Sequence, residues 1–155
     1  MSDAHLDQQQ NRFYDTEFVL LEGKEFASIE ELGPYISEVV NTRWMRNRGW
    51  NFYRWEVRDG CGSQARCRVD EVTCTLIFPC GTRNQLTVMR EVAHALTFDQ
   101  PGPKFCALYV SCVRRFMGRE HAEAIRRAFV VKRPKHRPRK PKWATLLDFI
   151  ECDFF

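Results

Sequence analysis

The sequence predicts an α+β fold, because strand-like segments in its middle are followed by helix-like segments toward its end. Residues 51–59 alternate between two faces, as the residues of a β-strand do. Residues 83–96 instead carry apolar side chains at helical spacing. With 155 residues, of which 44% are hydrophobic, the chain is long and apolar enough for one domain with a buried core.

A capped helix is expected near the start of this domain. Ser28 and Glu31 have the spacing of a capping box, in which the two side chains satisfy the first free amides of a helix. Apolar residues continue at helical spacing to Val40. Pro34 interrupts the pattern, so the helix either kinks there or begins there. The apolar and aromatic residues 13–21 before it suit a strand or a short helix.

Three strands and three helices are expected after residue 50. The strands cover residues 51–59, 66–70 and 73–78, and Pro79 with Gly81 ends the last of them. Thr82 is the expected N-cap of a helix over residues 83–96. A buried helix over residues 105–117 is expected to end at Gly118, and an amphipathic helix covers residues 119–129.

The positive charge of the chain is concentrated in one strip near its end. Residues 132–143 (KRPKHRPRKPKW) contain seven of the 24 Lys and Arg residues and no acid. Without these seven charges the net charge falls from +4 to −3. Three prolines rule out a helix, so an extended arm is expected, either a solvated linker or a contact for nucleic-acid phosphates. Its basic residues are Lys132, Arg133, Lys135, Arg137, Arg139, Lys140 and Lys142.

Residues 90–94 (REVAH) carry most of a metal-site motif on the helix over residues 83–96. In the zinc-hydrolase pattern HExxH, two histidines at i and i+4 share one helix face and bind one Zn²⁺, while the glutamate activates the bound water. Here Glu91 and His94 are present, but Arg90 stands at the first histidine position. A guanidinium has no lone pair for a metal, so Arg90 is instead expected to pair with an acid. The candidate partners are Glu91, Asp99, Glu120 and Glu123.

Several fragments in a shared order resemble a family of zincin-like metallohydrolases from actinobacteria and their bacteriophages, whose pattern contains HELAHxL followed by HGPxF. The resemblance covers residues 9–130, and Gly102, Pro103 and Phe105 match the second motif. It implies a small zincin-like domain, with a short, mostly antiparallel sheet packed against the motif helix and two further helices. It also implies that Glu91 was the general base and His94 a zinc ligand, while Pro101 stands where the third ligand would be.

Three functions follow as hypotheses. The first is a catalytically inactive zincin-like domain, phage-encoded, that acts by binding an unknown protein partner and needs no cofactor. An active zinc-dependent hydrolase or peptidase is the second, and it would require substitute ligands. The third is a nucleic-acid-associated protein that uses the basic arm. The candidate substitute donors near the motif are Asp99, Cys106, Glu120 and His121.

The expected organisation is a domain over residues 1–131, the basic arm over 132–143, and an aromatic and acidic segment over 144–155 that docks on the domain or on a partner. No apolar run is long enough to cross a membrane, and the N-terminus lacks a signal-peptide core. Seven cysteines, an odd number, favour reduced thiols that are mostly buried, with a thiolate metal site as the alternative. Together these features predict a cytoplasmic protein, in the host cytoplasm if a phage encodes it, with no membrane partner.

Overall fold

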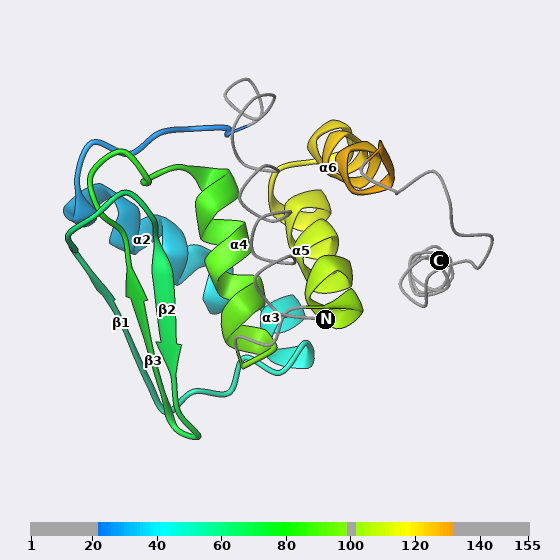
Figure 1. Cartoon of the computed structure of the whole chain (residues 1–155). Coiled ribbons are helices and arrows are strands. Elements are labelled where there is room, and N and C mark those ends of the chain that lie inside the picture. The colour runs from blue at the N-terminus through cyan, green and yellow to red at the C-terminus, as the bar shows by residue number, and fades with distance from the viewer. Residues whose placement is uncertain (1–21, 99–101, 132–155) are drawn as a thin grey trace, which may run out of the picture.

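The computed structural model describes residues 22–98 and 102–131 and has the expected α+β architecture. Its helices and strands are α2 (Ile29–Val40), α3 (Arg43–Asn47), β1 (Arg54–Arg58), β2 (Arg66–Val69), β3 (Thr73–Ile77), α4 (Gln85–Leu96), α5 (Pro103–Phe116) and α6 (Arg119–Val131). Figure 1 shows the sheet at one side of the molecule, with α4 between the sheet and α5, and α6 beyond α5. The expected strand or helix over residues 13–21 lies outside the described residues, as do residues 132–155.

The sheet is mixed, which corrects the expectation of a mostly antiparallel sheet. Its strand order is β1-β3-β2, with β3 parallel to β1 and antiparallel to β2. The antiparallel pair is a hairpin whose turn is closed by Asp70, which accepts hydrogen bonds from the amides of Val72 and Thr73. β1 joins the opposite edge of β3, so the connection over residues 59–65 must cross the end of β3 and reverse direction. This crossing makes β1 parallel to β3.

Gly60 lies at the crossing because the backbone passes very close to the end of β3. A Cβ atom at this position would meet Cγ2 of Ile77 and would come within 3.6 Å of the Pro79 ring. Arg83 links the same loop to the end of β3. It pairs with Asp59 at 2.7 Å, and its Nε donates to the carbonyl of Phe78 at 3.2 Å. The loop therefore has room for glycine only.

We expect Gly60→Ala to lower the free energy of unfolding by about 1–3 kcal/mol, because the added methyl overpacks the crossing. Gly33→Ala is the matched control, since a Cβ there would meet nothing within 4 Å and the residue lies inside α2. That change should raise stability by about 0.5–1 kcal/mol. Urea unfolding of both variants measures the difference, and equal effects of the same sign would contradict the packing at Gly60.

The N-terminal cap of α2 confirms the expected capping box. The Ser28 hydroxyl accepts from the amide of Glu31 at 3.3 Å, while the Glu31 carboxylate accepts from the amide of Ala27 at 3.1 Å. The helix begins at Ile29 and contains Pro34. It therefore does not begin at Pro34, which was the other possibility that the sequence left open. The short helix α3, capped by the Thr42 hydroxyl, was not expected, because five residues are too few to show a helical period.

The expected cap of α4 was wrong by two residues. Asn84, rather than Thr82, is the N-cap, and its side chain accepts from the amide of Thr87 at 2.8 Å. The Thr82 hydroxyl instead donates to the carbonyl of Pro79 at 2.7 Å and closes the turn after β3. The expected stop at Gly118 is confirmed: its φ is +107° and its amide donates to the carbonyl of Val113 at 3.1 Å.

The hydrophobic core lies between the inner face of the sheet, α2, α4 and α5. On the sheet it includes the buried residues Cys74 and Leu76, and the partly buried Trp55 and Val57 of β1 pack against it. α4 contributes most of its length, and α5 contributes one side, with Phe105, Tyr109, Cys112 and Val113. Within the ranges that the structure describes, no helix combines the length and the apolar character needed to cross a bilayer.

Candidate functional site

Helix α4 carries the candidate motif through the middle of the domain. Eight of its 12 residues are buried, between the sheet on one side and α5 on the other (Figure 1). Its first turn is fixed to the preceding chain, because the amides of Gln85 and Leu86 donate to the carbonyls of Lys24 and Glu22 at 3.1 and 3.0 Å. The side chains of the motif therefore project from a rigid, central helix.

Arg90 and Glu91 form an ion pair inside this environment. The distance from Arg90 Nε to Glu91 Oε1 is 2.8 Å, and the two side chains are 15% and 3% exposed. Adjacent residues on a helix point in different directions, so the arginine must fold back to reach its neighbour. A carboxylate this deeply buried requires compensation of its charge, and the guanidinium supplies it. This pairing confirms Glu91 as one of the expected partners of Arg90.

The charge of the Glu91 carboxylate affects a thiol on the inner face of the sheet. Burial raises the pKa of the Cys74 thiol on β3 to about 12, and the negative charge of Glu91 contributes in the same direction. Cys74 is almost completely buried, so the carboxylate lies on the core side of α4. Glu91 is therefore directed into the protein and held by a cation.

His94 lies one helical turn after Arg90 and packs against α5. Its ring stacks on that of Phe105, with centroids 4.1 Å apart and planes 23° apart. Phe105 in turn stacks on Tyr109 at 5.8 Å. Gly102, with φ of +143°, and Pro103 at the first position of α5 place Phe105 beside the histidine. The residues that carried the sequence resemblance thus meet between α4 and α5.

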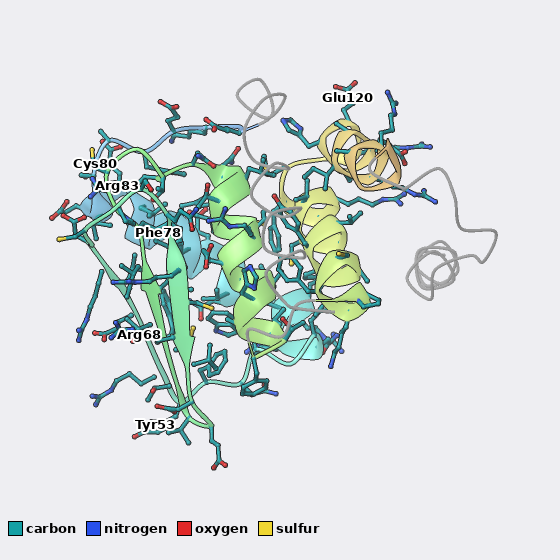
Figure 2. The ribbon with its side chains drawn as sticks, in the orientation of Figure 1. Tyr53, Arg68, Phe78, Cys80, Arg83 and Glu120 are labelled. Atoms are coloured by element: carbon teal, nitrogen blue, oxygen red, sulfur yellow. The ribbon has the colours of Figure 1, made fainter. Side chains whose placement is uncertain are left out.

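The described donor set does not fit a zinc ion. In residues 22–98 and 102–131, no three His, Cys, Asp or Glu side chains are grouped closely enough to hold a metal. Burial raises the pKa of the Cys106 thiol to about 11, so this thiol is protonated at neutral pH. Figure 2 shows Glu120 at the start of α6, apart from α4, and its side chain is exposed. Asp99 and Pro101 lie outside the described residues.

The basic arm proposed as a nucleic-acid contact also lies outside the described residues. A different basic surface was missed by the sequence analysis: the outer face of the sheet carries four arginines. They are Arg54 and Arg58 on β1 and Arg66 and Arg68 on β2. Even spacing within each strand, four residues in β1 and two in β2, is the signal that would have identified this surface, because such residues share a face.

The buried thiols predict a loss of stability at alkaline pH. Burial raises the pKa of Cys112 from 9.0 to about 12, although Arg48 acts in the opposite direction. The unfolded thiol therefore ionises first, so stability is complete below pH 9 and falls as the pH rises toward 12. The free energy of unfolding should therefore fall with rising pH, and removing this thiol by Cys112→Ala should make that fall smaller by about 1.4 kcal/mol per pH unit. Urea unfolding of the parent and the variant between pH 9 and 11 measures the difference. Equal slopes for the two proteins would contradict the assignment.

Comparisons of the chain with models of known protein families, with curated proteins and with solved structures find no match.

Proposed function

We propose that this chain is a catalytically inactive zincin-like metallohydrolase domain that acts by binding a partner. The observation that carries the proposal is the buried ion pair between Arg90 and Glu91, at the position where the motif would hold a zinc ligand and a general base. His94 remains one turn away, and Gly102, Pro103 and Phe105 remain beside it. Together these residues support the proposal that the site keeps the arrangement of the motif but no longer binds a metal.

The charge at the site supports the same reading. A dication in such a site would neutralise nearby carboxylates and lower the pKa of a bound water. Arg90 brings a fixed positive charge to this place but has no lone pair to donate. A guanidinium near an intended metal position also repels a dication. Arg90 therefore neutralises the Glu91 carboxylate, as a metal ion would, but it cannot activate a water molecule.

Glu91 is also poorly disposed to act as a base. A general base must place a carboxylate oxygen within about 3 Å of the proton that it removes. Here Oε1 already accepts from Arg90 Nε at 2.8 Å, and the side chain is 3% exposed. We propose that Glu91 now has a structural role, as the acceptor that fixes Arg90.

Metal analysis of the purified protein tests this proposal. After incubation with excess zinc and removal of the unbound ion, elemental analysis should give far less than one zinc per chain. The His94→Ala variant should give the same value as the parent. Near-stoichiometric zinc that disappears in His94→Ala would refute the proposal and would support an active hydrolase with substitute ligands.

A further inference from the structure

The outer face of the sheet is strongly basic and is not covered by any described helix. Strand residues alternate, so the side chains opposite the core project from this face. On this face, Arg54 of β1 lies beside Thr73 of β3. Thr75 of β3 lies between Glu56 of β1 and Arg68 of β2. In Figure 1, α4, α5 and α6 lie to one side of the strands. The outward residues that remain open to solvent are Arg54, Glu56, Arg58, Arg66, Arg68, Thr73 and Thr75, whereas Ile77 is buried at the loop that contains Gly60.

The acid on this face neutralises only one of the arginines. Glu56 pairs with Arg58 at 2.7 Å and also accepts from the Thr75 hydroxyl at 3.3 Å. The remaining three, Arg54, Arg66 and Arg68, are exposed and form no ion pair with any residue that the structure describes. Their Cα atoms are fixed by the strand pairing, so the three side chains leave the sheet from fixed positions on one face.

An exposed aromatic side chain lies at one end of the sheet. Tyr53 precedes β1 directly and is 89% exposed, so its ring is open to solvent beside the end of the strand. The neighbouring amide of Arg54 donates to the carbonyl of Val72 at 3.2 Å, which joins this point to the hairpin turn, and Val72 is also exposed. Figure 2 shows Tyr53 at this end of the sheet and Arg68 along it. A free aromatic ring therefore adjoins the row of cations.

We infer that this sheet face binds single-stranded nucleic acid. Exposed arginines complement the phosphate backbone, and contacts of this kind dominate the affinity of nucleic-acid-binding proteins. Unpaired bases stack on exposed aromatic rings, which double-stranded nucleic acid does not allow, so Tyr53 favours a single strand. The inference goes beyond the proposed loss of the metal site and does not depend on it.

Fluorescence anisotropy with a labelled single-stranded oligonucleotide tests the inference on the full chain. The triple variant Arg54→Ala/Arg66→Ala/Arg68→Ala should bind about tenfold or more weakly, and its salt slope should fall by about 2, since each phosphate contact contributes about 0.7. The matched control is Arg119→Ala/Arg127→Ala, which removes two exposed arginines from α6 and should leave affinity within about twofold. Circular dichroism checks that each variant is folded.

The role of Tyr53 is tested separately. Tyr53→Ala should weaken single-strand binding about tenfold with an unchanged salt slope, and should leave duplex binding unaffected. Parent-like binding by the triple variant would overturn the inference. So would equal affinity for duplex, heparin or anionic phospholipid vesicles together with no effect of Tyr53→Ala, because that result indicates a general polyanion surface. Metal analysis is independent of all these outcomes, so failure here leaves the proposed function standing.

Discussion

Replacing Arg90 with alanine should lower the free energy of unfolding by about 3–5 kcal/mol at neutral pH. The substitution leaves the Glu91 carboxylate buried without its cation, and an uncompensated buried charge is among the most costly single defects in a protein. The ion pair Arg58–Glu56 provides a comparison of similar length, at 2.7 Å, but its side chains are 64% and 42% exposed. Arg58→Ala should therefore cost only about 0.2–1 kcal/mol. Urea unfolding at neutral pH measures both changes.

A double-mutant cycle separates the pair from the packing of the arginine side chain. Arg90→Met/Glu91→Gln removes both charges at similar volume and should be close to neutral, because paired buried charges contribute little net stability. The coupling between the two positions should then exceed about 2 kcal/mol. A destabilisation that is the same for Arg90→Met with and without Glu91→Gln would show that Arg90 acts by packing alone.

If the proposed origin of the site is right, two introduced histidines should create a zinc site. The double variant Arg90→His/Pro101→His supplies imidazoles at the two positions where the metallohydrolase pattern has histidine, with His94 as the third donor. Zinc should bind with a stoichiometry near one per chain, and zinc at about 100 times its dissociation constant should raise the free energy of unfolding by about 2.7 kcal/mol. Titration calorimetry and thermal unfolding with and without zinc measure the two effects.

Two further variants show whether the restored donors form the site. Adding His94→Ala to the double variant should abolish the zinc effect. Arg90→Gln/Pro101→Gln removes the guanidinium and the proline without supplying imidazole, and should bind no zinc. If the histidine-restored variant is folded but binds no zinc, the proposed descent from a zincin-like site is wrong.

The sequence predicted the local elements of this fold better than their arrangement. The capping box at Ser28 and the stop at Gly118 depend on neighbouring residues, and both expectations were confirmed. The strand direction was not predictable, because the parallel pairing of β1 depends on a crossing at Gly60 that no period reveals. Tyr53 shows the same limit: the expected strand covered residues 51–59, but β1 begins at Arg54, and Tyr53 lies before it and is exposed.

The candidate site was predictable in its residues but not in its geometry. The spacing of Arg90, Glu91 and His94 was visible in the sequence, and Glu91 was among the expected partners of Arg90. Stacking of His94 on Phe105 required the packing of two helices that are separated by a loop. The basic sheet face was missed because it is formed by residues of two strands that become neighbours only through β3.

Zinc titration of the chelator-treated parent protein, followed by its thermal unfolding midpoint, tests most directly whether an arginine has replaced the metal. With Arg90 paired to Glu91, the midpoint should stay the same as zinc is added, and the His94→Ala variant should respond identically. A saturable rise in the parent that is absent from His94→Ala would contradict the account, because it would mean that the imidazole still helps to hold an ion.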